Sequence, residues 1–433
     1  MARLTRGDLL PRLLTDAPGP RSRRLSQRLG VAEAPGINTL GAGLSSLVWE
    51  EARGSNVLDV DGNRFVDLTS GFGVAAVGHR HPAVVAAVRR QSGRLLHGLA
   101  DVHPHRLRID LAERLSALAP VDDPTVYFAV SGADALEVAL KTAILATGHQ
   151  RILAFTPSYH GLTLGALALS SREAFRLPFA HHLSRTVERL PFGAPLADLT
   201  TRLDDGPPFA AVVVEPIVGR EGILLPPTGW LSALSRLCRA RGTLLVADEV
   251  FTGFGRTGAL FAVEDETVRP DLLACGKALG GGLPIAAVIG RRELMAAWNR
   301  GGEALHTGTF VAHPLACAAA LATLGVLDQE ALPQRAARLG RAIGPRLAAW
   351  PSRFAAVHEI RGRGLVWGVE LHSHAGAAHA VSEALARGVL WLAGGPEGRV
   401  AQIVPPLVIS ERQLSDALDR LETVLAGLPG PAS

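Results

Sequence analysis

The chain contains very little lysine. Of the 44 residues that are lysine or arginine, only Lys141 and Lys277 are lysines. Codon bias in a GC-rich genome explains such a background, since alanine, glycine, leucine and proline are abundant, but it does not explain the two exceptions. Arginine stays protonated in nearly every setting, whereas lysine can lose its proton and act as a nucleophile. A lysine kept against this background, such as Lys277 shortly before three consecutive glycines, is therefore a candidate for chemistry.

Cysteine and long apolar runs are also scarce. The three cysteines, Cys238, Cys275 and Cys317, form no C-x-x-C pair, which predicts a reducing compartment rather than a disulfide framework. No apolar run reaches the roughly 18 residues of a membrane span. The N-terminal segment contains Asp8 and Asp16 and lacks the apolar core of a secretory signal. We therefore expect a cytoplasmic protein without a membrane partner.

Charge and histidine spacing give no sign of a nucleic-acid or metal site. The formal net charge is only +4, and the densest basic run, residues 21–28, has no interleaved aromatic residues. Two H-x-H pairs, at 79–81 and 103–105, have the spacing of metal ligands. No acidic or cysteine partner has matching spacing, so core and turn roles are expected for these histidines.

The N-terminal part predicts little regular structure before residue 40, because Pro18, Gly19, Pro20 and Pro35-Gly36 interrupt it. Residues 56–71 alternate apolar and polar positions around Asp61-Gly62, which predicts a hairpin. Helical patterns follow over residues 82–96 and 105–118.

The middle of the chain alternates short apolar runs with helix-length amphipathic segments, which is typical of a largely parallel sheet covered on both faces. The runs are residues 125–130, 151–155, 210–216, 243–250, 271–275 and 284–290. From about residue 331 the pattern changes to helix, strand (364–371), helix, strand and a last helix from 411 to 425. We therefore predict a large domain over 76–328 and a smaller α/β domain from 329–433, completed by residues 1–75.

Reactive or ligand-binding residues follow five of these apolar runs. In open α/β sheets, ligands bind beyond the carboxyl ends of the strands, so these residues are expected to form one site. They are Ser131-Gly132-Ala133, Tyr159, Glu215, Asp248 and Lys277.

This set has the groups that pyridoxal phosphate requires. The Lys277 amine would hold the aldehyde as a Schiff base, and the Asp248 carboxylate would keep the pyridine nitrogen protonated. The backbone N–H groups of residues 131–133 open a helix and would bind the phosphate. Tyr159 would stack on the ring. Taken singly, Asp248 could instead cap a helix or form a salt bridge, and Glu215 could simply end a strand.

Lys141 receives a different interpretation. It lies off the apolar stripe of its predicted helix, which predicts a solvent-exposed lysine.

Seven segments, in the same order along the chain, resemble the class III pyridoxal-phosphate-dependent aminotransferases of fold type I. They are residues 78–82, 131–141, 159–161, 215–222, 247–258, 276–290 and 306–321. The resemblance implies a mostly parallel seven-stranded sheet flanked by helices in the large domain, and a homodimer with active sites at the subunit interface. It implies a ping-pong reaction through the pyridoxamine form, which moves an amino group from an amine donor to an oxo-acid acceptor.

The resemblance also assigns individual residues. His160 joins the cofactor-binding set, Val250 would pack on the ring face opposite Tyr159, and Thr309 would bind the phosphate held by the partner subunit. The chain departs from the family at Phe251, where a glutamine that bonds the cofactor's phenolic oxygen is usual. It also departs at Asp134 and His313, where glutamate and asparagine are usual.

The substrate expectation rests on another departure. Many members pair an arginine before a C-terminal proline with the substrate's α-carboxylate, and the glutamate matching Glu215 gates that arginine. Gln402 occupies the position here. Arg399 is three residues away and would point to the opposite face of its strand, so Arg220 is the better substitute. We therefore expect an ω-amino or simple amine donor, and a weak reaction with 2-oxoglutarate unless another arginine serves it.

Two alternatives remain at this point. One is another reaction of the same cofactor, a decarboxylation or an aminomutase reaction, which product analysis would distinguish. The other is a catalytically silent binding protein, which would be expected to lack Lys277 or Asp248.

Overall fold

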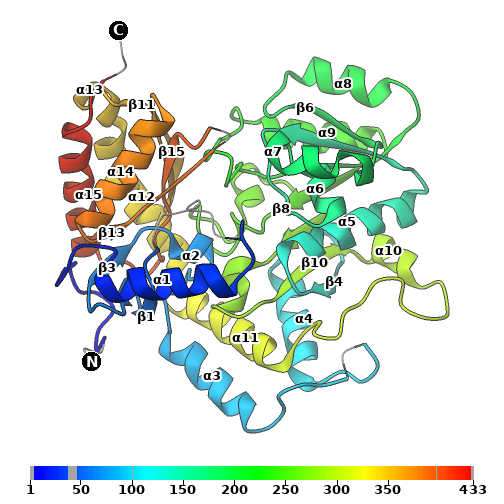
Figure 1. The fold of residues 1–433 in the computed structure, drawn as a ribbon. Helices are drawn as coiled ribbons and strands as arrows, with labels where there is room; N and C mark the ends of the chain where they lie inside the picture. The colour runs from blue at the N-terminus through cyan, green and yellow to red at the C-terminus, as the bar shows by residue number, and fades with distance from the viewer. Residues whose placement is uncertain (1–3, 38–45, 100, 396, 431–433) are drawn as a thin grey trace.

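The computed structural model describes residues 4–37, 46–99, 101–395 and 397–430. A seven-stranded sheet forms the larger part of the molecule, with helices on both sides (Figure 1). In spatial order its strands are β4 (Pro124–Ala129), β10 (Ala286–Arg291), β9 (Leu272–Cys275), β8 (Leu244–Asp248), β7 (Phe209–Val214), β5 (Arg151–Thr156) and β6 (Val187–Pro191). Only β10 runs antiparallel to its neighbours. Each of the six predicted apolar runs forms one strand, so this prediction is confirmed.

The sheet buries side chains on both faces. Ile152 and Ala154 of β5 pack with one core, which includes Leu136 of helix α5 (Gly132–Thr147). Leu153 and Phe155 belong to the other core, together with helices α4 (Arg106–Leu118), α9 (Trp230–Ala240) and α11 (Pro314–Gln329). Successive strand residues point to opposite faces, so a strand covered on both sides must be apolar throughout. This explains the continuous apolar runs.

The seventh strand, β6, had no such signal. It lies at the edge of the sheet and pairs only with β5, and its first four residues are only partly buried. An edge strand exposes one side to water and tolerates charges such as Glu188 and Arg189, so periodicity did not reveal it.

Two four-stranded sheets form the rest of the molecule. One contains β1 (Trp49–Arg53), β2 (Asn56–Asp59), β3 (Arg64–Asp67) and β13 (Val389–Leu390); the other contains β11 (Val357–Arg363), β12 (Val366–Leu371), β15 (Val400–Ile403) and β14 (Leu392–Gly394). The hairpin predicted around Asp61-Gly62 is confirmed by the antiparallel pairing of β2 with β3. Because β13 pairs with β3, segments from the two ends of the chain lie side by side, as Figure 1 shows in blue and orange. The domain boundaries themselves stay a prediction.

The remaining helices fill the connections and cover the sheets. They are α2 (Ser70–Gly73), α3 (Pro82–Ser92), α6 (Leu164–Leu169), α7 (Glu173–Arg176), α8 (Leu196–Asp204), α10 (Arg292–Met295), α12 (Leu332–Ala348), α13 (Trp350–Arg353), α14 (His374–Ala386) and α15 (Glu411–Ala426), with the 3₁₀ helices η1 (Leu177–His182), η2 (Ala262–Glu266), η3 (Lys277–Gly280) and η4 (Ala296–Trp298). Among the described residues, no single helix has the length and apolar content of a membrane span. Helix α11 and the segment Leu332–Arg353 have that length and apolar content only when taken together, and they are bent by 56° relative to each other.

The prediction of little regular structure before residue 40 is wrong over Pro20–Ala32, which form helix α1. Pro20 opens this helix at a position where its missing N–H costs no hydrogen bond. The Asp61 carboxylate accepts from the N–H groups of Arg21 and Ser22 at 2.7 and 2.8 Å. The helix start is therefore stabilised by a residue about 40 positions away, which no local pattern indicates.

Candidate active site

Five strands deliver the predicted residues to one edge of the large sheet. Strands β5, β7, β8 and β9 are parallel, and β4 runs the same way because β10 is antiparallel to both β9 and β4. Lys277 lies two residues after the end of β9 and opens η3, with a backbone φ of +41°. This left-handed conformation is unfavourable for a lysine, and such strain is concentrated at functional sites.

The Lys277 amine lies near charges of both signs. Its Nζ is 4.9 Å from the centre of the Phe251 ring, and it forms no hydrogen bond or ion pair with any residue that the structure describes. Burial lowers the pKa of this amine; the nearby Arg220 charge acts in the same direction, and the carboxylates of Asp248 and Glu215 oppose it. A lowered pKa increases the fraction of neutral, nucleophilic amine.

Asp248 and His160 form a buried pair at the end of β8. His160 Nδ1 lies 2.7 Å from Asp248 Oδ2, and the Val250 N–H donates to Oδ1 at 3.1 Å. Burial alone would lower the pKa of His160, but the hydrogen bond and charge of Asp248 raise it overall. The salt-bridge role left open for Asp248 is therefore present. It still leaves acceptor capacity, because a carboxylate offers about four lone-pair sites.

The neighbouring carboxylate, Glu249, is used elsewhere. It accepts hydrogen bonds from the Thr252 hydroxyl and, at 2.8 Å, from the Val263 N–H. Burial raises the pKa of Glu249 to about 7. Its side chain thus stabilises the loop after β8, so that of these two adjacent carboxylates it is Asp248 that acts on Lys277.

The start of α5 offers backbone donors beside Val250. Ser131 caps the helix, its Oγ accepting from the Asp134 N–H at 3.2 Å. The N–H groups of Gly132 and Ala133, at the first two helical positions, have no carbonyl partner within the helix. A Cβ on Gly132 would lie 2.7 Å from Val250 Cγ1, so only glycine fits this approach.

Glu215 and Tyr159 lie on the loops after β7 and β5. Glu215 accepts from the N–H groups of Tyr159 and Gly219, both at 2.9 Å. Burial raises the pKa of Glu215 to about 7, and the charge of Asp248 adds to the effect. The Arg220 guanidinium carbon lies 4.3 Å from the centre of the Tyr159 ring. The structure thus locates Arg220, which the sequence did not, within the Lys277 site.

Gln402 and Arg399 have separate partners. The Gln402 amide donates to the carbonyl oxygens of Gly219 and Arg220, at 3.2 and 3.4 Å, and so holds the loop that carries Arg220. Arg399 forms ion pairs with Glu370 at 3.2 Å and Glu397 at 2.8 Å.

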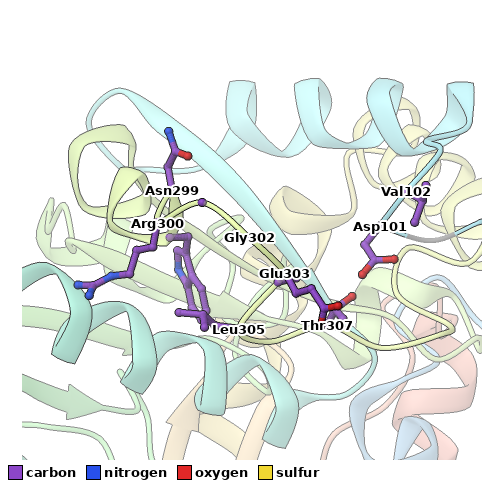
Figure 2. A pocket seen from close by; sticks show the side chains of 11 residues that line it. Asp101, Val102, Asn299, Arg300, Gly302, Glu303, Leu305 and Thr307 are labelled. Carbon is purple, nitrogen blue, oxygen red and sulfur yellow. The ribbon is translucent and has the colours of Figure 1, made fainter.

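Thr309 is the predicted residue that the chain does not bring to this group. It is exposed, in the segment between η4 and α11, and within the described ranges it forms no hydrogen bond with the other predicted residues. Part of the same segment lines a cavity of about 530 Å³, which Figure 2 shows between Asp101-Val102 and residues 298–307. None of the predicted site residues lines this cavity.

The interpretation of Lys141 as a solvent-exposed lysine is wrong. Its side chain is half-buried, and Nζ lies 2.9 Å from His306 Nδ1. Three of the four H-x-H histidines have partners in the described chain: His79 pairs with Asp67 at 2.8 Å, His81 accepts from the Ala83 N–H of α3, and His105 accepts from the Arg108 N–H of α4.

The donor set fits a ligand with an aldehyde, a ring nitrogen and a phosphate. The fit rests on the amine of Lys277 with its lowered pKa, the carboxylate of Asp248 and the free N–H groups of α5. In addition, His160 Nε2 is buried and has no partner in the described chain.

Comparisons with known proteins identify the family. Residues 41–425 match the aminotransferase class-III family. The chain is 38% identical to acetylornithine aminotransferase from Methanothermobacter thermautotrophicus over 382 residues, which cover 88% of this chain and 94% of the relative. It is 36% identical to 4-aminobutyrate aminotransferase from Mycobacterium tuberculosis over 449 residues, which cover 96% and 98%.

Two solved structures agree with this. Ornithine aminotransferase from Toxoplasma gondii superposes with a TM-score of 0.85 at 31% identity, covering 92% of this chain and 94% of the other. A pyridoxal-phosphate-bound amine transaminase from an uncultivated Pseudomonas species gives 0.84 at 28% identity, covering 91% and 99%. The chain therefore belongs to the class III aminotransferases, which are pyridoxal-phosphate-dependent enzymes of fold type I.

Proposed function

We propose that this aminotransferase takes its amino group from a donor whose amine is remote from any α-carboxylate, an ω-amino acid or simple amine, and passes it to an oxo acid. The observation that carries the proposal is the pair of contacts described for Arg220 and Gln402. When bound, pyridoxal phosphate supplies an electron sink for the substrate carbon that loses its proton.

The roles of the chain's own residues follow from their positions. Lys277 holds the cofactor and, once its amine is free, moves the proton at the substrate carbon that bears the amino group. Asp248 keeps the ring nitrogen protonated, and His160 orients Asp248 through the 2.7 Å contact. Tyr159 and Val250 flank the ring, and the helix start at residues 131–133 binds the phosphate.

The substrate preference follows from two side chains. The Gln402 amide is occupied by two carbonyl oxygens and cannot form the bidentate charged pair that favours an α-carboxylate. Arg220 stacks on Tyr159 and has no ion-pair partner among the described residues, so its N–H groups can donate to a substrate carboxylate. Glu215 accepts from the backbone N–H groups of Tyr159 and of Gly219, which precedes Arg220, and so fixes both loops that form this contact. The similarity to acetylornithine aminotransferase and 4-aminobutyrate aminotransferase supports transamination of such donors over decarboxylation or an aminomutase reaction.

Single-turnover conversion of the cofactor should therefore be faster with 4-aminobutyrate than with glutamate. Arg220→Ala should lower kcat/KM for 4-aminobutyrate by about 10- to 100-fold, because a hydrogen bond to a charged group is worth about 1.5–3 kcal/mol. The loss should be smaller for a monoamine without a carboxylate. Arg399→Ala is the matched control, since Arg399 is already paired with Glu370, and it should leave the donor ranking unchanged. The proposal fails if glutamate reacts fastest and Arg220→Ala changes nothing.

A homodimer is the second part of the proposal, and the cytoplasmic location predicted from the sequence remains with it. Large apolar side chains are exposed in two segments that meet at the cavity in Figure 2, including Leu99, Val102, Leu305 and Phe310, each 56–62% exposed. A second copy covering this surface would bury them, and Thr309 lies beside Phe310.

Subunit mixing tests whether Thr309 serves the partner's site. Lys277→Ala and Thr309→Ala proteins should each be impaired alone. In a mixed dimer one of the two sites has both native residues, so activity should return when the two are unfolded and refolded together. If Thr309 served its own subunit, no site would be complete and mixing would restore nothing.

A further inference from the structure

The second lysine of the chain has a defined partner. Lys141 Nζ lies 2.9 Å from His306 Nδ1, and His306 Nε2 lies 2.9 Å from Asp134 Oδ1. An ammonium group only donates, so Nδ1 must accept and Nε2 must carry the proton that it donates to Asp134. His306 is thus a neutral bridge between a cation and an anion, both on helix α5.

His306 anchors the segment that carries Thr309. Residues 301–311 contain no helix or strand, and every hydrogen bond that joins them to the rest of the described chain is made by His306. In addition to the two hydrogen bonds of the His306 ring nitrogens, the His306 carbonyl oxygen accepts from the Tyr127 hydroxyl of β4. The position of Thr309, three residues later, therefore depends on this histidine together with the neighbouring Phe310, whose ring centre lies 5.4 Å from that of His97.

The contacts from Lys141 through His306 end at Asp134, at the start of α5. Asp134 accepts from the Val130 N–H at 2.8 Å through its second oxygen, and its own N–H donates to Ser131. It thereby holds the turn that presents the N–H groups of Gly132 and Ala133. A carboxylate near this helix start would by itself repel a phosphate, and the charge of Lys141, held through His306, offsets it.

We propose that Lys141 is a positioning residue for cofactor phosphate: through His306 and Asp134 it links the phosphate-binding start of α5 to the segment that carries Thr309. This inference rests on the proposed phosphate-binding role of both elements. It also accounts for the second retained lysine, because the compact ammonium group of Lys141, on its flexible side chain, can reach from α5 to the ring nitrogen of His306.

The test compares the affinity of apoenzyme for pyridoxal phosphate and for pyridoxal, which lacks the phosphate. Lys141→Met should lower the affinity for pyridoxal phosphate about tenfold, because a charge-assisted hydrogen bond is lost from the series of contacts that ends at the phosphate-binding start of α5. The affinity for pyridoxal should stay within about twofold. Amide hydrogen exchange over residues 301–311 should become faster. The matched control is Arg300→Met, which also removes a cation bonded to α5, at the Leu145 carbonyl, but at a residue just before this segment; it should change neither affinity.

Equal losses for both ligands, or no loss for either, would overturn the proposal. Thermal unfolding of the apoenzyme checks that Lys141→Met folds; if it does not, His306→Gln carries the same comparison, since it removes only the bridge. Failure of the proposed phosphate-binding role is separately visible, because wild-type apoenzyme would then bind pyridoxal as tightly as pyridoxal phosphate.

Discussion

Lys277→Ala is expected to lose turnover by at least about 10²- to 10⁴-fold, the contribution of a positioned general acid–base group. The expectation follows from the role proposed for the Lys277 amine, which is partly desolvated and free of other partners in the described chain, as the group that moves the proton at the substrate carbon. Lys277→Arg should fail as well, since a guanidinium does not lose its proton near neutral pH. The measurement is the single-turnover rate with saturating amine donor.

The matched control uses the other lysine. Lys141→Met is expected to weaken binding of pyridoxal phosphate but to retain turnover once the cofactor is saturating. Turnover by Lys277→Arg at the wild-type rate would show that another base moves the proton.

Asp248→Asn is expected to keep the fold and much of the bound cofactor, and to slow proton abstraction by about two orders of magnitude or more. An amide cannot hold the ring nitrogen in its charged form, and it also weakens the contact with His160. Stopped-flow absorbance with the amine donor measures the rate.

Glu249→Gln is the control for this variant, because the Glu249 side chain bonds to Thr252 and Val263 rather than facing Lys277. It should leave proton abstraction close to wild type. Normal turnover in Asp248→Asn together with a slow Glu249→Gln would reverse the assignment of the two carboxylates.

The sheet and the gathering of residues at its edge were predictable because both follow from local patterns. A strand buried on both faces must be apolar, and parallel strands end on the same side of a sheet. The sequence therefore predicted that Asp248, at the end of β8, and Lys277, shortly after β9, lie close together. The edge strand β6 and helix α1 escaped this logic, since β6 is only partly buried, and α1 is mostly exposed and depends on Asp61.

Contacts between distant side chains could not be predicted in this way. Lys141 lies off the apolar stripe of α5, and only the fold brings His306, 165 residues later, to its amine. The stacking of Arg220 on Tyr159 and the bonds of Gln402 to the Arg220 loop likewise join loops that follow different strands. Resemblance to the family suggested that Glu215 gates an arginine; here its two oxygens accept backbone N–H groups.

Lys277 is expected to hold the cofactor, and borohydride reduction followed by peptide mapping is the decisive test of this assignment. Purified enzyme loaded with pyridoxal phosphate should lose its near-visible absorption band on reduction and carry the reduced cofactor on the peptide that contains Lys277. The label should be absent from Lys277→Ala protein treated in parallel. A label on the peptide containing Lys141, or no fixed cofactor on any peptide, would show that Lys277 does not hold the cofactor.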